Sequence, residues 1–514
     1  MRQPLTATFV SFSSAWWKLS FLASLSLAAL LFVTDLVSAG EQYMLIVVGL
    51  LSYAAISIPL LRKRYFEPFD PMVLVAISVF VGCGLRSFLL TFADEGNDKV
   101  AALTDGIPLD KLAASSALVP VSLVMLSLGY LALAHKRVRI DRLPGVGSNR
   151  WSRLNLLIVT TALAVISGIS VALLVRELQI NFGSLAGFSA KRALQMESGA
   201  GGGYASMGYL RWGADLAKVG LVLLVVDRLS INRDEVSRPP VERFFHLVLM
   251  VFLLGLSIFW PLVSSSRTGV LEVLLALSVI FTYLGFKGGK RGVKRKFISY
   301  AVVSVVLALF VLVSMGVWRQ YTSDTKRIDI APKTLLVNNT VGSGNFLPLE
   351  RTALIIHRMG GANHHFFGTS YLNVVFSPIP RSMWEGKPEM SVARFVRRDL
   401  YGRETFTNGY PAGLLGEAYI NFHFAGMIII PFIAGMGLRL FFNTFSGHMR
   451  QKSRGPIVLY SLALWPIGIQ LVELDFALVF INTMVLIVPS ILALAFIGRP
   501  RERMQVAFGA DKGY

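Results

Sequence analysis

The residues best suited to chemistry lie in one long polar segment, residues 318–411, between apolar stretches. This segment holds twelve Lys or Arg residues, seven Asp or Glu residues and three histidines. It is longer than a connection between two helices needs, so we interpret it as a functional loop. Its basic excess indicates an anionic ligand, because the planar fork of arginine donates two parallel hydrogen bonds to phosphate and stays protonated. For any single arginine here, a solvated surface position is the alternative.

Arg267 is a further candidate, because it lies at the tip of a tight apolar hairpin. A rigid arginine at a membrane surface could clamp phosphate, and the alternative is that it snorkels to the interface. Glu272 lies deeper in the same apolar run. Buried charges in membranes are usually paired, so we expect a nearby arginine as its partner. Arg86, inside another apolar run, we interpret as a snorkelling residue.

A shorter loop, residues 176–207, is basic and rich in glycine, and Arg192 within it is a candidate ligand contact. The apolar run after it carries charges near its start, of which Arg211 is a second candidate contact. Asp215 lies one turn after Arg211 and one turn before Lys218. We interpret these neighbours mostly as structural ion pairs.

Polar residues also open a later apolar run, at residues 413–423. Helical spacing places Glu417 and Asn421 on one face and Tyr419 and His423 on another. Glu417 could act as a general base toward a hydroxyl group, or it could pair with an arginine of the long loop.

The sequence predicts neither a metal nor a cofactor. His364 and His365 are adjacent, and adjacent side chains rarely converge on one ion. Cys83 is the single cysteine and lies in an apolar run, which excludes an internal disulfide and a cysteine-based metal site. We therefore expect metal-independent chemistry, and chelation should leave the activity of the purified protein unchanged.

Composition predicts an all-α polytopic membrane protein. Hydrophobic residues make up 54% of the chain and charged residues 16%, against about 25% charged in soluble domains. About twelve apolar runs are each long enough to cross a hydrocarbon core of ~30 Å. The predicted spans are residues 19–37, 43–61, 71–92, 112–134, 154–175, 208–227, 244–263, 268–286, 297–317, 414–442, 456–472 and 476–497. The large loop thus lies between the ninth and tenth helices.

The distribution of basic residues predicts the topology. Loops that stay in the cytoplasm collect Lys and Arg. One orientation of the chain places all of its most basic segments on the cytoplasmic side, namely those at Arg62, Lys136, Arg228, Lys287 and Lys452. Both termini are then cytoplasmic, and both long loops are periplasmic. Residues 37–39 resemble a signal-peptidase site, but the apolar run before them is too long for an ordinary signal peptide, so we favour a retained span. Cleavage there would move the N-terminus outside without changing the rest of the topology. The net charge of +20 fits this bias, so it does not indicate nucleic acid.

Three regions result from these spans. Residues 1–317 hold the first nine helices and the basic loop at 176–207. Residues 318–411 form the large outer loop, which we expect to bind substrate and carry catalysis. Residues 412–514 hold the last three helices and a cytoplasmic tail.

Several motifs together resemble the bacterial O-antigen or oligosaccharide repeat-unit polymerases of the Wzy type. The motifs are Pro380-Arg381 followed by Trp384 and Lys387-Pro388, then Gly413 to Phe422, with Ser266-Arg267 upstream. In that family, arginine-rich outer loops carry an arginine and a glycine with ten residues between them. Arg192 with Gly203 and Arg398 with Gly409 match this spacing. His423 stands where the family commonly has glycine. This difference puts the close packing of the tenth predicted span in doubt, or it adds a titratable group to the site.

The resemblance implies a glycosyltransferase of the bacterial inner membrane. It would transfer a growing glycan from undecaprenyl diphosphate to another lipid-linked repeat unit at the outer face. The catalytic residues would be Arg267, Arg381 and Arg398, stabilising the diphosphate as charge gathers on it, and Glu417 as the base, with His365 or Asp399 next. Substrate contacts would be Arg192, Arg211, Lys387, Arg397, His364, His365, Tyr419 and Asn421. A chain-length regulator and a flippase are partners that the resemblance leaves open.

Two other activities fit the same features. An O-antigen ligase shares a large late outer loop and relies on a loop histidine, and this loop contains three. A flippase or exporter of lipid-linked oligosaccharide would use an inward cationic cavity rather than outer-loop motifs. Secondary transporters often show internal repeats and broken helices, and we find no internal repeat here.

Overall fold

The computed structural model describes residues 12–13, 15–38, 43–62, 65–92, 103–148, 151–177, 208–230, 239–264, 266–285, 346–360, 365–379, 386–402 and 410–498. Shorter described pieces are residues 303, 306–308, 310–311, 313–315, 340–342 and 383–384.

Ten helices in the described part are long and apolar enough to cross a membrane. They are α1 (Ala15–Ser38), α2 (Met44–Leu61), α3 to α4 (Pro71–Phe92), α6 to α7 (Leu109–Ala132), α8 (Arg153–Glu177), α12 (Pro240–Val263), α13 with its π-helical end (Arg267–Gly285), α19 (Gly413–Arg450), α20 to α21 (Arg454–Glu473) and α22 (Phe476–Ile497). Strands β1 (Phe12–Ser13) and β2 (Tyr65–Phe66) form one short antiparallel pair. The chain is a helical, multi-pass membrane protein, as its composition predicts.

Two of the predicted spans are not among these ten. The span predicted at 208–227 is the helix α11 (Gly208–Ser230), which has spanning length but carries several charged residues. Of the span predicted at 297–317, the structure describes parts of a shorter apolar helix over Val306–Met315. The count of twelve therefore stays a prediction.

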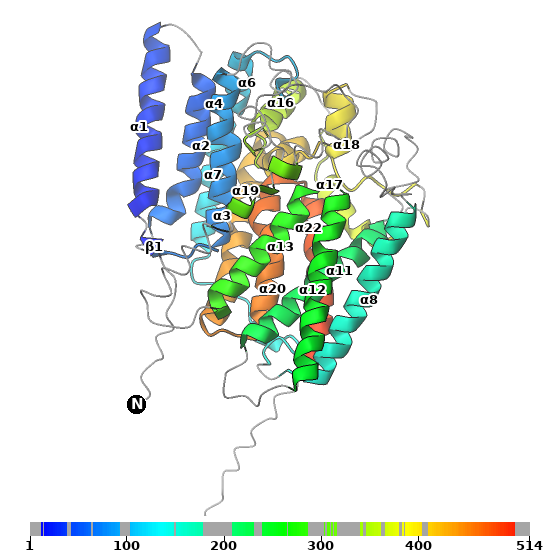
Figure 1. The fold of residues 1–514 in the computed structure, drawn as a ribbon. Helices are drawn as coiled ribbons and strands as arrows, with labels where there is room; N and C mark the ends of the chain where they lie inside the picture. Colours follow the sequence, from blue (N-terminus) through cyan, green and yellow to red (C-terminus); the bar gives the residue numbers. More distant parts are fainter. Residues whose placement is uncertain are drawn as a thin grey trace, which may run out of the picture.

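The helices run side by side along one axis, and the two ends of the bundle differ (Figure 1). Short helices from the predicted large loop lie at one end, which we call the loop end: α16 (Leu349–Met359), α17 (Thr369–Leu372) and α18 (Ala393–Phe395). The opposite end carries the β1–β2 pair, and we call it the basic end. Its described arginines and lysines include Arg62, Lys136, Arg139, Arg142, Arg228, Arg450 and Arg454.

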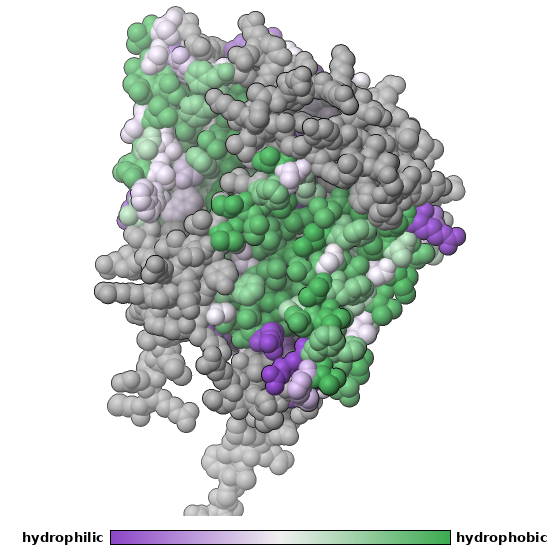
Figure 2. Space-filling view, viewed as in Figure 1, coloured by the Kyte–Doolittle hydropathy of each residue, from purple (hydrophilic) through white to green (hydrophobic). Residues whose placement is uncertain are grey.

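Apolar side chains cover the outside of the bundle as well as its interior. Leu154, Val165 and Val251 on α8 and α12 are each more than half exposed. Figure 2 shows an almost continuous hydrophobic face over these helices. Such a face suits contact with lipid, which agrees with the assignment of these helices to a membrane.

Part of the predicted large loop belongs to the core rather than to a solvated surface. On α16, Leu349, Ala353 and Leu354 are fully buried. Glu350, also on α16, receives two hydrogen bonds from Nη1 of Arg86, at 3.0 and 3.1 Å. Because Arg86 is 0% exposed, its interpretation as a snorkelling residue is wrong. This buried ion pair instead joins the loop to α4 (Arg86–Phe92).

The helix α19 is broken near its loop end. Phe422 and His423 leave helical geometry, and His423 has φ +55° and ψ −143°. The chain folds back so closely that a Cβ on Gly426 would lie 2.1 Å from the carbonyl oxygen of Ala418. The span predicted at 414–442 is therefore present, but it consists of a short helix to Asn421 and a long helix after the break.

Candidate functional site

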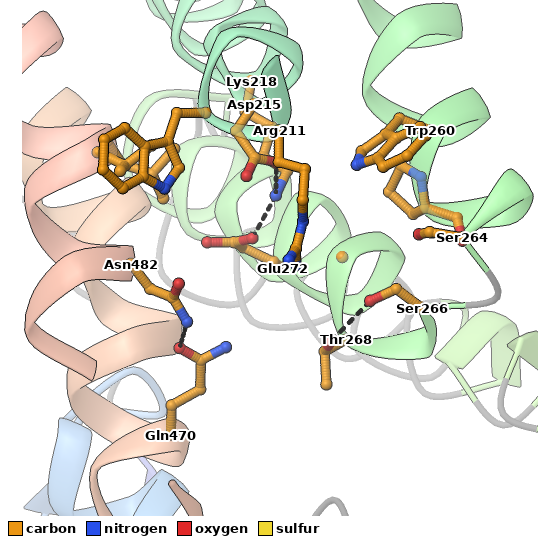
Figure 3. Close-up of a pocket in the computed structure, with 15 residues that line it drawn as sticks. Arg211, Asp215, Lys218, Trp260, Ser264, Ser266, Thr268, Glu272, Gln470 and Asn482 are labelled. Carbon is orange, nitrogen blue, oxygen red and sulfur yellow. Dashed lines mark hydrogen bonds and ion pairs between the residues drawn. The ribbon is translucent and has the colours of Figure 1, made fainter. Parts of the chain in front are cut away.

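A polar cavity of about 170 Å³ lies among α11, α12, α13, α22 and the π-helical segment before α21 (Leu471–Glu473) (Figure 3). Its charged and amide lining comes from Arg211, Asp215, Lys218, Glu272, Gln470 and Asn482. The hairpin tip between α12 and α13 adds the hydroxyl groups of Ser264, Ser266 and Thr268. Charged groups inside a membrane bundle are costly, so such a cavity is a candidate functional site.

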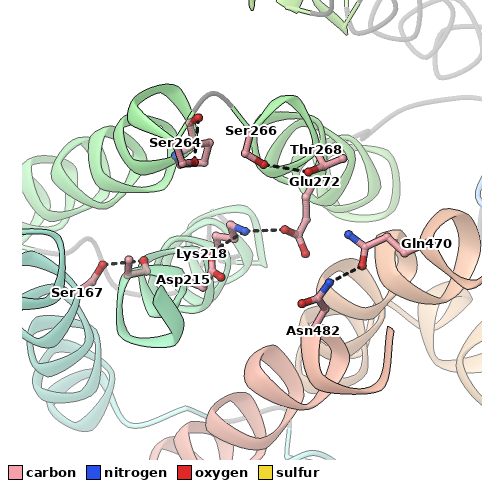
Figure 4. A network of polar contacts seen from close by, with 11 residues as sticks. Ser167, Asp215, Lys218, Ser264, Ser266, Thr268, Glu272, Gln470 and Asn482 are labelled. Carbon is pink, nitrogen blue, oxygen red and sulfur yellow. Dashed lines mark hydrogen bonds and ion pairs between the residues drawn. The ribbon is translucent and has the colours of Figure 1, made fainter. Parts of the chain in front are cut away.

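Lys218 is the centre of the charges in this cavity (Figure 4). Its Nζ lies 2.6 Å from Oε2 of Glu272 on α13 and 2.8 Å from Oδ1 of Asp215 on its own helix. The side chains of Lys218 and Glu272 are 8% and 10% exposed, whereas that of Asp215 is 32% exposed. One cation thus holds two carboxylates, so the triad carries one net negative charge when all three groups are ionised.

These contacts test two of the predictions made from the sequence. The Asp215–Lys218 ion pair is confirmed. The expectation that Glu272 is paired is also confirmed, but its partner is Lys218 rather than an arginine. Arg211 lines the same cavity. Arg267 is half-buried and lies between the lining residues Ser266 and Thr268.

Neutral polar groups complete the lining on the side of α22. The amide of Asn482 donates to Oε1 of Gln470 at 3.0 Å, and the hydroxyls of Ser266 and Thr268 lie 3.0 Å apart. Amide and hydroxyl groups both donate and accept hydrogen bonds. Together with the cations, they can hold a ligand that combines hydroxyl groups with negative charge.

A second polar cluster joins α19, α17 and α22 at the loop end. Glu417 is 1% exposed, and its two oxygens accept hydrogen bonds from the hydroxyl of Ser370 at 2.7 Å and from the backbone N–H of Phe476 at 2.6 Å. Asn421, one turn later, donates to the Ser370 hydroxyl at 2.8 Å and accepts from the backbone N–H of Gly368 at 2.9 Å. The predicted shared face of Glu417 and Asn421 is confirmed. Both residues bind protein groups here, so the base role of Glu417 stays a prediction.

The break in α19 lies beside this cluster, and the side chains of Tyr419, His423 and His365 meet there. The break leaves the carbonyls of Ile420 and Asn421 without helical partners. They accept hydrogen bonds from the backbone N–H groups of Phe366 and Phe367, each at 3.1 Å. The hydroxyl of Tyr419 lies 3.0 Å from Nε2 of His423, which confirms that these two residues share a face. The ring of His365 lies 5.1 Å from that of His423. His423 has a positive φ, a backbone conformation that glycine adopts without strain.

The basic residues predicted in the large loop are in different surroundings. Lys387 is buried and donates to the carbonyls of Ser377 and Ile379 at 3.3 and 2.7 Å. Arg397 is 7% exposed and stacks over the ring of Tyr410. Arg398 is 62% exposed and forms a two-pronged ion pair with Asp399, at 3.0 and 3.1 Å. Arg192, Arg381 and His364 lie outside the described residues.

Asp475, which precedes α22, is a structural residue that the sequence reasoning did not single out. It accepts hydrogen bonds from the backbone N–H of Ala412 at 2.7 Å and from the hydroxyl of Ser391. Burial raises the pKa of its carboxyl group above the ordinary value, although these hydrogen bonds act in the opposite direction. Asp475 and Glu417 therefore fasten the loop end to the start of α22.

Gln470 and Asn482 were also missed, although each is an amide inside an apolar run, which is the signal that could have found them. Among the described residues, no group of three or more His, Cys, Asp or Glu side chains is arranged to hold a metal ion. Comparisons of the chain with protein-family models, with curated proteins and with solved structures give no match.

Proposed function

We propose that this protein is a polysaccharide repeat-unit polymerase, a glycosyltransferase that uses a lipid diphosphate-linked glycan as donor. The observation that carries the proposal is the polar cavity at Lys218, where cations, carboxylates and amides meet inside a membrane bundle. A lipid-linked sugar diphosphate combines the same features: an apolar chain, a double phosphate and many hydroxyl groups. The motif resemblance to Wzy-type polymerases points to the same substrate.

The proposed orientation places the loop end outside a bacterial inner membrane. Basic residues gather at the opposite end, which is typical of the cytoplasmic side. Both termini then lie in the cytoplasm, with twelve spans in all. The substrate headgroup would reach the cavity from the outer face.

In the proposed reaction, the acceptor hydroxyl of one repeat unit attacks the anomeric carbon of the donor glycan. The new C–O bond forms while the bond to the diphosphate breaks, and undecaprenyl diphosphate leaves with the negative charge. Arg211 and Arg267 would stabilise that charge without a metal, and Gln470 and Asn482 would hold sugar hydroxyls. Asp215 or Glu272 would accept the hydroxyl proton, because both carboxyl groups lie beside Lys218 in the cavity. Glu417 is the alternative base.

Two alternatives each have one specific observation in their favour. The break in α19 favours a flippase or exporter, because transporters bind substrate at discontinuous helices. The close approach of His365 to His423 favours an O-antigen ligase that relies on a loop histidine.

Mass spectrometry of undecaprenyl-linked glycans, in a strain lacking this gene and in its parent, separates the three activities. A polymerase predicts single repeat units accumulated on the outer leaflet, with no longer forms. Long lipid-linked polymer without its final acceptor would mean a ligase. Single units trapped on the inner leaflet would mean a transporter.

A further inference from the structure

A second cavity, of about 200 Å³, lies between α11 and α12 at the basic end, far along both helices from the polar cavity. Arg228, in the last turn of α11, and Arg243, in the first turn of α12, line it. Its other lining is apolar, including Leu247 and Met250, apart from His246. Figure 2 shows hydrophilic side chains at the lower margin of the apolar face, near the ends of these helices.

His246 supplies the specific feature of this cavity. Its side chain is 9% exposed, and Nδ1 lies 2.9 Å from the carbonyl oxygen of Glu242. A carbonyl oxygen only accepts, so Nδ1 must carry a proton. Nε2 is buried and has no hydrogen-bond partner among the described residues. Buried polar atoms in proteins are nearly always paired, and His246 lines the cavity, so this nitrogen is a candidate acceptor for a ligand group there.

The surroundings of the cavity define the ligand's chemistry. Arg228 and Arg243 supply two guanidinium groups, which match a phosphate. The side chains of Phe244 and Leu247 are 66% and 53% exposed, so apolar surface continues from the cavity onto the lipid-facing side of α12. In a neutral imidazole Nε2 accepts a hydrogen bond, which a headgroup hydroxyl can donate.

We propose that this cavity binds an anionic phospholipid with a hydroxyl-bearing headgroup, such as phosphatidylglycerol, from the leaflet at the basic end. The phosphate lies between Arg228 and Arg243, the headgroup hydroxyl meets Nε2 of His246, and an acyl chain follows the apolar face of α12. Basic sites between membrane helices bind anionic lipid in this way. This site is separate from the proposed glycan chemistry and does not depend on it.

The test measures the binding of phosphatidylglycerol to the purified full-length protein in detergent. Native mass spectrometry detects the bound lipid, and thermal unfolding measures the gain in stability. The wild type should bind phosphatidylglycerol in preference to phosphatidylcholine and gain stability from it. The Arg228→Ala/Arg243→Ala variant should lose at least about ten-fold in affinity, because each charge-assisted hydrogen bond of this kind is worth about a factor of ten. His246→Leu should reduce the preference for phosphatidylglycerol while the fold stays intact.

The matched control is Arg62→Ala/Arg153→Ala, which removes two exposed arginines from the same end. It therefore has the same net charge as the Arg228→Ala/Arg243→Ala variant. If both double variants lose affinity equally, attraction to the basic end explains the binding and the site is refuted. If the alanine variant does not fold, Arg228→Lys/Arg243→Lys keeps the charge and should still weaken binding, because lysine lacks the planar fork. Stabilisation of the wild type by inorganic phosphate as strong as that by the lipid would also overturn the proposal.

Discussion

Lys218 on α11 and Glu272 on α13 form an ion pair of 2.6 Å in which both side chains are buried. The same ammonium group holds Asp215 at 2.8 Å. Removing one member of a buried ion pair leaves an uncompensated charge, whereas removing both members often costs little. This difference makes it possible to separate the structural role of the pair from its role in the proposed chemistry.

We predict that Lys218→Met lowers the free energy of unfolding by about 3–5 kcal/mol, because Glu272 is left buried without its cation. Lys218→Met/Glu272→Met should recover most of that stability. Both variants should make no polymer, since the charged centre of the cavity is gone. Thermal unfolding in detergent and glycan length on gels measure the two effects. A stable double variant that makes full-length polymer would remove the pair from the site.

Arg398 tests the predicted role of the large loop. Its guanidinium group is exposed and bound to Asp399, and this hydrogen bond and charge raise its pKa further, so it stays protonated. Replacement by Ala or by Lys should shorten the polymer, because lysine cannot supply the planar fork. Arg394→Ala is the matched control, since Arg394 forms an exposed ion pair with Glu389 nearby. Full-length polymer from both Arg398 variants would exclude Arg398 from the site.

The raised pKa of Asp475 predicts that stability at the loop end depends on pH. Burial raises its folded-state pKa, so the folded protein holds the proton more tightly than the unfolded chain does. The resulting stabilisation is complete below the ordinary aspartate pKa of about 3.9 and is lost as pH rises through the raised pKa. Resistance of residues 386–402 to proteolysis should therefore increase on mild acidification.

Asp475→Asn should remove this pH dependence while keeping the fold. The amide oxygen can still accept from Ala412, and the amide nitrogen can donate to the hydroxyl of Ser391. An unchanged pH profile in the Asp475→Asn protein would assign the effect to another group.

Gly426 tests the break in α19. A Cβ there would lie 2.1 Å from the carbonyl oxygen of Ala418, so Gly426→Ala should force the two parts of the helix apart and lower the thermal stability. Gly437 on the same helix is the control, because nothing lies within 4 Å of a Cβ placed there. Gly437→Ala should be neutral or stabilising by up to about 1 kcal/mol. Equal thermal stabilities of the two variants would contradict the close contact.

Ten of the twelve spans agree with the described helices, because hydropathy over a membrane thickness is a local property of the sequence. The break at Phe422 and His423 could not be predicted, because no proline marks it and the apolar pattern continues across it. It depends instead on the backbone N–H groups of Phe366 and Phe367, which come from the distant loop and bond to the freed carbonyls.

The polar contacts show the same division between local and distant partners. Asp215 with Lys218, and Glu417 beside Asn421, follow from helical spacing and were predicted correctly. Arg86 was misinterpreted because Glu350, its partner, lies 264 residues away in sequence. The meeting of Lys218 with Glu272 likewise requires the packing of α11 against α13.

We propose that the protein joins lipid-linked repeat units in the cavity at Lys218. The most direct test is the purified protein in liposomes that contain one synthetic undecaprenyl diphosphate-linked repeat unit as both donor and acceptor. Mass spectrometry of the lipid-linked products should show two or more joined units with the wild type and single units with Lys218→Met/Glu272→Met. Single units alone with the folded wild type, or chain growth with the double variant, would contradict the claim.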